Sequence, residues 1–192
     1  MSTSYADTDL TGTNLDRVIF SGDFTRAKLQ GCDLAGRDLS DCNLQFANLT
    51  GATLSGADLK KAVLFGANLR NADLYHADLY QANLIEANLN HANLRHADLT
   101  EANLHSASLY LADLTCATFT GADLSEVSFI DANLYEANLS RSDLRGADFT
   151  GAVLTGAVFD GAMISVGTFH TISASDSGAI FRNVTVVDYP QK

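Results

Sequence analysis

Large hydrophobic residues recur at every fifth position over most of this chain. Counted in steps of five from Phe24, the series runs unbroken to Phe169, and its 30 positions hold 23 Leu, 6 Phe and one Ile. The position two residues before each holds Ala in 23 of 30 cases, and the residue between them is usually Asp or Asn. The repeat Ala-(Asp/Asn)-Leu-x-x therefore covers residues 22–171.

A five-residue period is incompatible with a straight helix or a straight strand. Five residues of an α-helix turn by about 500°, so successive Leu side chains would spread around the whole helix. In a strand, an odd period sends successive Leu side chains to opposite faces. They all point one way only if the chain bends once per repeat. Because repeated bends in one sense make a coil, the period predicts a solenoid with Leu and Ala inside.

The run Ala67–Leu79, which reads Ala-Asn-Leu-Arg-Asn-Ala-Asp-Leu-Tyr-His-Ala-Asp-Leu, resembles the pentapeptide-repeat proteins. This resemblance implies an all-β fold, a right-handed quadrilateral parallel β-helix with four repeats in each coil. The chain would then form about eight coils, stacked about 4.8 Å apart.

The start of the chain departs from the repeat by one residue. Leu10, Leu15 and Phe20 also step by five, but they lie one residue out of phase with Phe24. We therefore expect residues 1–21 to form an irregular first coil that caps the N-terminal end of the solenoid.

The other end of the chain abandons the period. Phe129, Phe149 and Phe169 follow one another at intervals of four repeats, so they are expected to stack on one side of the core. In the tail, 172–192, the stretch 180–187 is rich in β-branched residues and predicts a strand. Since an open solenoid end exposes apolar core and unpaired backbone, this tail is expected to cap the last coil, and it could also form a homodimer contact.

Charge and cysteine content narrow the class of protein. Asp and Glu total 23 against 12 Lys and Arg, a formal net charge of −11, so direct binding to nucleic acid or to an anionic membrane is not expected. No apolar run approaches the roughly 20 residues of a membrane span, and the start lacks the features of a signal peptide.

The cysteines indicate a reducing compartment. Cys32 and Cys42 would lie on opposite sides of the coil and Cys116 would face outward, so three unpaired thiols indicate a cytoplasmic protein.

Outward residues at intervals of four repeats form columns on the predicted coil. One column holds His76, His96, Cys116 and Glu136, and neighbouring side chains about 4.8 Å apart could converge on zinc. The spacing is not a recognised metal motif, however, and polar surface residues share columns by chance. We therefore predict no metal and no other cofactor.

Two further groups of outward residues are candidates for a partner-binding surface. Asp38, Asp58, Asp78 and Asp98 form an acidic column, which either hydrogen-bonds its own turns or offers a negative stripe to a basic partner. The second group is apolar, and its members are scattered surface residues or a contact patch. It consists of Phe46, Val63, Phe65 and Ile85.

These features favour an interaction protein over an enzyme. The sequence contains no Gly-rich phosphate loop, no Ser/His/Asp signature and no metalloprotease motif. Our first hypothesis is a non-enzymatic scaffold that binds an unidentified protein partner. The alternative is an acidic DNA mimic that binds DNA gyrase, because the chain resembles the quinolone-resistance type of pentapeptide protein in its acidity. The repeats here are far more regular than in that group.

The inward position of the series can be tested at Leu84. A fully buried Leu contributes about 1.5–3 kcal/mol, and a buried carboxylate adds a desolvation cost. Leu84→Asp is therefore expected to break the stack and to lower the melting temperature measured by circular dichroism. An unchanged melting curve would contradict the inward placement.

Overall fold

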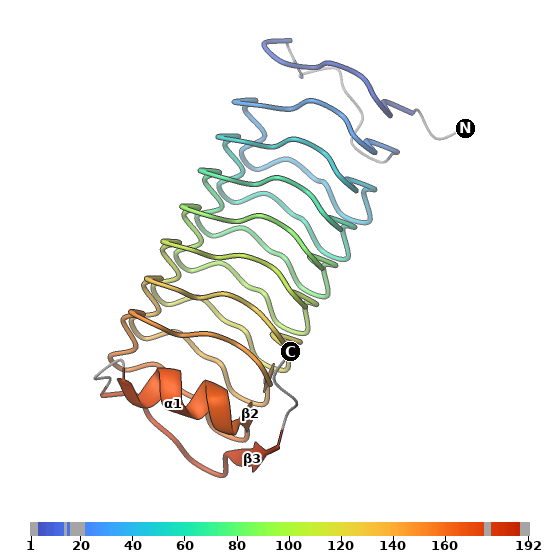
Figure 1. The fold of residues 1–192 in the computed structure, drawn as a ribbon. Helices are drawn as coiled ribbons and strands as arrows, with labels where there is room; N and C mark the ends of the chain where they lie inside the picture. Colours follow the sequence, from blue (N-terminus) through green and yellow to red (C-terminus); the bar gives the residue numbers. More distant parts are fainter. Residues whose placement is uncertain (1–3, 14, 16–21, 175–177, 189–192) are drawn as a thin grey trace.

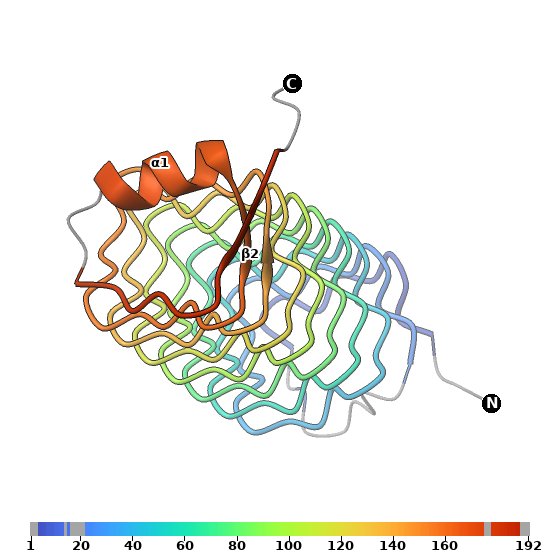
Figure 2. The ribbon, with the colours of Figure 1, turned by 90° about the horizontal axis from the view of Figure 1, so that it is seen from below.

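The computed structural model describes residues 4–13, 15, 22–174 and 178–188. The chain winds into a rod of stacked coils, and helix α1, Val166–Ala174, lies across the C-terminal end (Figure 1). Seen toward that end, the coils repeat one outline along a common axis (Figure 2). Each coil therefore contacts mainly the coils before and after it, as in other repeat solenoids.

Successive coils pair in parallel, and their register is constant along most of the rod. Asp38 bridges Asp58 and Asp58 bridges Asp78, each four repeats later, and the same offset holds at equivalent positions as far as Val158. The backbone N–H groups of Leu44 and Phe46 donate to carbonyls of the next coil at 2.8 and 2.9 Å. Four repeats therefore make one coil, and a repeat solenoid is confirmed. Its handedness and its total number of coils stay predictions.

The interior is filled by the five-residue series and by the small residues that precede it. Every large residue of the series from Phe24 to Ile164 is buried, most of them completely. The small positions from Ala27 to Ala162 are also buried, with Arg37 as the exception. Because each coil adds the same set of inward side chains, the core is a continuous apolar column along the rod.

The bend in each repeat occurs at the second variable position. Phe46, Gly66 and Glu86 have φ angles of 57°, 61° and 58°, which lie in the left-handed region. Ordinary L-residues avoid this region, but here a carbonyl of the next coil accepts the N–H of each corner residue, such as Phe46 to Phe65. Stacking thus holds the corners in a conformation that an isolated strand would not keep.

The first coil is one residue shorter than the others. Ser4 pairs with Asp23 and Asp9 with Lys28, so each pair is one residue closer in sequence than the pairs of the regular coils. Leu10 and Leu15 are buried, as their spacing predicts. Phe20 and most of the segment that absorbs the missing residue lie outside the described residues.

Three short strands form a parallel sheet at the C-terminal end, in the order β1-β2-β3. They are β1, Asp143–Leu144, β2, Met163–Ser165, and β3, Thr185–Val187. The tail pairs with the last coil in a longer register than the regular one, through Ile180 opposite Val158 and through β3 opposite β2. Phe181 stacks on Phe159 with ring centroids 4.9 Å apart. Residues 178–188 therefore continue the solenoid past its last regular coil.

Helix α1 replaces the final turn that the sequence period predicts. Ser165, the last residue of β2, caps the N-terminus of the helix, because its hydroxyl accepts the N–H of Thr168 at 3.2 Å. The Thr168 hydroxyl donates to the carbonyl of Leu144 at 3.0 Å. Ile172 is buried against the end of the core. In the described part of the chain, no helix has the length and apolar character needed to cross a membrane.

The prediction that Phe169 points into the core is wrong. Phe129 and Phe149 do stack, with ring centroids 4.8 Å apart, but Phe169 lies on α1 and is 45% exposed. A helix turns by about 100° per residue, so it does not continue a five-residue register. Ile172 takes the inward position instead, and the fold is not entirely β.

The homodimer contact proposed for the tail stays a prediction. Several apolar side chains of this end are exposed, between 40% and 52%. They are Val166, Phe169, Ile180, Phe181 and Val186.

Two substitutions on the same helix distinguish its buried side from its exposed side. Ile172→Asp places a carboxylate in the apolar end of the core, so it should lower the free energy of unfolding by about 3 kcal/mol or more. Phe169→Asp changes an exposed position and should alter it by about 0.5 kcal/mol or less. Urea unfolding measures both. Equal losses from the two variants would contradict the packing of α1.

Candidate functional site

The four apolar candidates lie on three successive coils of one side of the solenoid. We call this side the patch face, and it comprises residues 43–46, 63–66, 83–86, 103–106, 123–126 and 143–146. Val63 pairs with Asn43 of the preceding coil and with Asn83 of the following coil. The amide of Phe46 donates to the carbonyl of Phe65, and Gly66 donates to Ile85, both at 2.9 Å. Backbone pairing therefore fixes the relative positions of Phe46, Val63, Phe65 and Ile85.

An edge-to-face aromatic pair forms the centre of this patch. The rings of Phe46 and Phe65 have centroids 5.1 Å apart and an interplanar angle of 83°. Phe46 is 50% exposed, and its backbone is in the left-handed region at the corner of the repeat. Its ring lies over Gly66, where a Cβ atom would come within 2.7 Å of Phe46 Cδ1 and Cε1. The glycine thus leaves the space in which this ring lies.

Val63 replaces a polar residue that closes the turn in most other repeats. In most repeats the Asp or Asn side chain accepts the N–H two residues later and so closes the turn, as Asn83 does for Ile85 at 3.1 Å. Val63 occupies the same repeat position and has no side-chain acceptor. The turn at this site is held by backbone pairing alone, and an apolar surface takes the place of a polar one.

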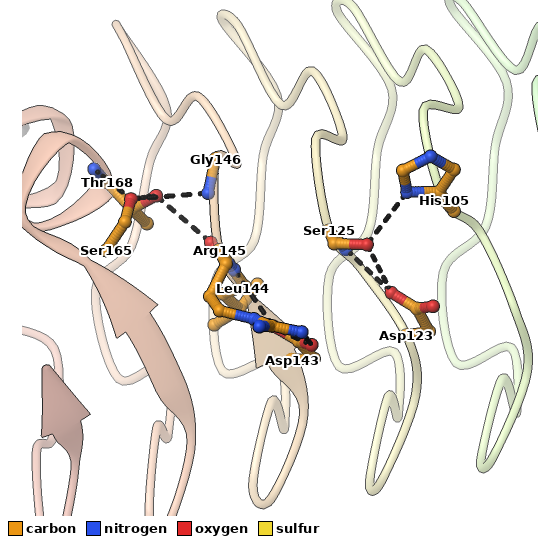
Figure 3. Close-up of polar contacts among 9 residues, drawn as sticks. All are labelled: His105, Asp123, Ser125, Asp143, Leu144, Arg145, Gly146, Ser165 and Thr168. Carbon is orange, nitrogen blue, oxygen red and sulfur yellow. Dashed lines mark hydrogen bonds and ion pairs between the residues drawn. The ribbon is translucent and has the colours of Figure 1, made fainter. Parts of the chain in front are cut away.

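The patch face continues into a polar network, which Figure 3 shows. Ser125 is 7% exposed, and its hydroxyl lies 2.6 Å from Asp123 Oδ1 and 2.8 Å from His105 Nδ1. Because a carboxylate only accepts, the hydroxyl proton goes to Asp123, and His105 Nδ1 carries the proton that it donates to Ser125. His105 Nε2 then accepts from the Ser106 hydroxyl at 3.3 Å.

This network does not have the arrangement of a catalytic triad. The histidine and the aspartate both form hydrogen bonds with the serine. In a catalytic triad the serine is instead hydrogen-bonded to the histidine, and the histidine to the carboxylate.

An ion pair lies on the next coil of the same face, where Arg145 Nε is 2.9 Å from Asp143 Oδ1. Burial raises the pKa of Asp143, and the hydrogen bonds and charge of Arg145 outweigh it and leave that pKa below its ordinary value. Sequence reasoning missed this network, although the placement of His105 and Ser125 in one column is visible in the sequence.

The acidic column lies on the neighbouring side of the solenoid rather than on the patch face. Each aspartate accepts a hydrogen bond from the backbone N–H of the residue two positions later. Asp38 accepts from Ser40 at 3.0 Å, and Asp98 accepts from Thr100 at 2.9 Å. The hydrogen bonds from the Ser40 hydroxyl and amide lower the pKa of Asp38. These carboxylates therefore close their own turns, which is one of the two roles that the sequence allows.

One lysine bridges two members of this column. Lys60 Nζ lies 2.6 Å from Asp78 Oδ2 and 3.2 Å from Asp58 Oδ2. Hydrogen bonds to Asp78 and then to Asp58 raise the pKa of Lys60. The middle of the acidic column is consequently an ion-paired surface, and the structure does not join it to the apolar patch.

The histidine column has the wrong geometry for a shared metal ion. The rings of His76 and His96 stack with centroids 4.8 Å apart and an interplanar angle of 11°, and Tyr75 lies edge-on to both. Zinc lies about 2.0–2.1 Å from each imidazole nitrogen, in the plane of the ring, which two parallel rings at this separation do not satisfy. Cys116 Sγ points to Glu136 at 3.8 Å. Across the described residues, no three His, Cys, Asp or Glu side chains form a group that could hold a metal.

The three cysteines form no disulfide, as the spacing predicts. Cys32 and Cys42 are buried and Cys116 is partly exposed. Burial raises the pKa of the Cys42 thiol to about 11, so this thiol stays protonated and unreactive at neutral pH.

Comparison with protein families gives one family, described as pentapeptide repeats, with 8 copies in this chain. The matched residues are 23–60, 42–79, 77–115, 92–129, 112–151 and 132–165. No curated protein matches the chain.

Several solved structures are similar to this chain. A pentapeptide repeat protein from the thylakoid lumen of Arabidopsis thaliana is 32% identical over 55% of this chain and 70% of that chain, with a TM-score of 0.45. HetL from the cyanobacterium Nostoc sp. strain PCC 7120, which is involved in heterocyst differentiation regulation, is 30% identical over 87% of each chain, with a TM-score of 0.33. Full-length QnrB1, a plasmid-mediated fluoroquinolone resistance protein, is 19% identical over 92% of this chain and 89% of that chain, with a TM-score of 0.49.

The family match extends over residues 23–165, where the constant coil-to-coil register and the buried Leu series were found. On these grounds the chain belongs to the pentapeptide repeat family.

Proposed function

We propose that this protein is a non-enzymatic interaction module that binds another protein through the patch face. The observation that carries the proposal is the aromatic pair on a rigid surface, in which Phe46 is half exposed and Phe65 is partly buried. Aromatic side chains supply large contact areas at low entropic cost and are enriched at binding hot spots. A surface held by coil-to-coil hydrogen bonds loses little further freedom on binding.

Folding alone does not account for this patch. A bulky aromatic residue is unfavourable in the left-handed region, where Gly or Asn would be accommodated more easily, yet Phe46 occupies such a corner. Val63 stands where most repeats have a turn-closing Asp or Asn. Both residues add apolar surface at positions where the repeat favours small or polar side chains, and a contact surface explains that choice.

Charge density argues against the DNA-mimic alternative. Residues 23–162, which span seven turns of the solenoid, hold 18 Asp and Glu against 9 Lys and Arg, a net charge of −9. DNA carries one negative charge per about 1.7 Å of its axis. Seven coils stacked about 4.8 Å apart would therefore need roughly 20 net negative charges to match DNA of the same length. The charge here is less than half of that, and Lys60 neutralises part of the acidic column. No observation on this chain favours gyrase binding.

A matched pair of glycine substitutions tests the patch without changing an aromatic residue. Gly56 and Gly66 have φ angles of 64° and 61°, so alanine should cost about 1–2 kcal/mol of stability at either position. A Cβ atom at Gly56 meets nothing within 4 Å, whereas one at Gly66 collides with the Phe46 ring. Gly66→Ala is therefore expected to displace Phe46 and to release bound partners, and Gly56→Ala is expected to retain them.

The measurement is affinity capture from the source cells followed by quantitative mass spectrometry. Proteins held by the wild type and by Gly56→Ala, but lost from Gly66→Ala and from Phe65→Asp, are the partners that the proposal requires. If all four baits capture the same proteins in the same amounts, the patch face is not the binding surface.

A further inference from the structure

We propose that the partner segment that binds the patch face carries an apolar side chain and, two coils farther along the rod, a lysine or arginine that pairs with Glu86. This inference rests on the proposed function and adds the chemistry of the partner. It follows from one column of corner residues on the patch face, which reads Phe46, Gly66, Glu86 on three successive coils.

Glu86 is placed to receive a charge from outside the molecule. It is exposed at its corner, next to Ile85 of the patch. Its backbone N–H donates to the carbonyl of His105 at 3.0 Å, which fixes the corner. Among the described residues, none donates a hydrogen bond or forms an ion pair with its carboxylate.

Of the two basic residues nearest to the patch, Arg26 is ion-paired within the chain and Lys61 shares its column with one aspartate. Arg26, one coil before Phe46 in the same column, makes two hydrogen bonds to the carboxylate of Asp7, at 2.6 and 2.7 Å. At the opposite edge of the patch face, Lys61 follows Asp41 in its column. Together with the net charge of −11, this leaves a negative field around an apolar centre.

The charged residues on the remainder of the patch face are also mostly acidic. Beyond Ile85 the face holds Asp123, Glu126 and Asp143, and its one arginine there, Arg145, is paired with Asp143. A partner with acidic residues beside its apolar side chain would meet like charges at Glu86 and again on the coils of residues 123–126 and 143–146. A basic partner would meet complementary charges, and it would be oriented by them.

The spacing follows from the stacking of the coils. Phe46 and Glu86 are two coils apart, which is about 10 Å at a strand spacing of about 4.8 Å. In an α-helix that lies along the rod, residues seven positions apart are separated by about 10.5 Å and share a face. An apolar residue at one position and a lysine seven residues later therefore match the aromatic pair and Glu86.

Three fluorescently labelled helical peptides of otherwise identical alanine-based sequence serve as probes. The first carries two leucines one turn apart and a lysine seven residues after the first leucine; the second has glutamate in place of that lysine; the third has serine in place of the leucines. Binding to the full chain is measured by fluorescence anisotropy at low salt. The wild type is expected to bind the leucine–lysine peptide about three- to tenfold more tightly than the leucine–glutamate peptide, and to bind the serine peptide least.

Reversal of one charge then tests Glu86 itself. Glu86→Lys is expected to abolish or invert the preference between the two leucine peptides. Glu136→Lys is the matched control, because Glu136 is an exposed glutamate at the same repeat position on another side of the solenoid. It makes the same change in net charge and should leave the preference intact.

The outcomes separate this inference from the function on which it rests. Any of three results would overturn the assignment of a basic partner. The wild type could bind the two leucine peptides with equal affinity, it could bind no peptide, or Glu86→Lys and Glu136→Lys could have equal effects. If Phe65→Asp abolishes peptide binding while Glu86→Lys has no effect, the apolar patch remains the binding surface and the charge assignment falls. If Phe65→Asp also has no effect, both proposals fail.

Discussion

The left-handed corner in every repeat is the constraint on which this structure depends. A chain that places a large apolar residue at every fifth position can bury all of them only if it bends at a fixed point in each repeat. The bend requires a positive φ, which most residues adopt at a cost. Here corner residues as different as Asp41, His91 and Arg141 adopt it, because the next coil binds the backbone on both sides of each corner. The corners and the coil-to-coil hydrogen bonds thus form together or not at all.

This arrangement separates stability from surface chemistry. The inward Leu and Ala side chains and the backbone pairs are repeated in every coil, so the fold is stabilised without the two variable positions of each repeat. Those positions are then free to carry charges, aromatic rings or apolar groups. The patch face uses this freedom twice, with the apolar group around Phe46 and Phe65 and with the polar network of His105, Asp123 and Ser125. The first leaves the Phe46 ring half exposed, whereas the second is saturated by internal hydrogen bonds.

The two ends of the rod show how a periodic structure is terminated. At the N-terminal end the first coil follows the others with one residue fewer, and Tyr5 stacks on Phe24 with ring centroids 4.9 Å apart. At the C-terminal end the chain changes to a helix, and Ile172 covers the core where another leucine would have been. The tail then returns to pair with the last coil, and Phe181 stacks on Phe159 at the C-terminal end of the rod. Both ends therefore place an aromatic ring against the terminal coil.

The five-residue period was sufficient to predict the solenoid and its inward residues, because a strict period leaves the backbone one way to bury the leucines. The sides on which outward residues lie followed only with the four repeats per coil that the resemblance to pentapeptide-repeat proteins implies. The phase shift before Phe24 likewise predicted the short first coil, and the spacing of the cysteines predicted that they form no disulfide. The end of the repeat was misplaced at Phe169, because apolar spacing alone does not show where strand geometry gives way to a helix capped by Ser165. How side chains on neighbouring coils meet became visible only in the folded chain. The Phe46 ring over Gly66, the lysine between Asp58 and Asp78, and the stacked rings of His76 and His96 depend on rotamers and on contacts between coils, which a one-dimensional pattern does not contain.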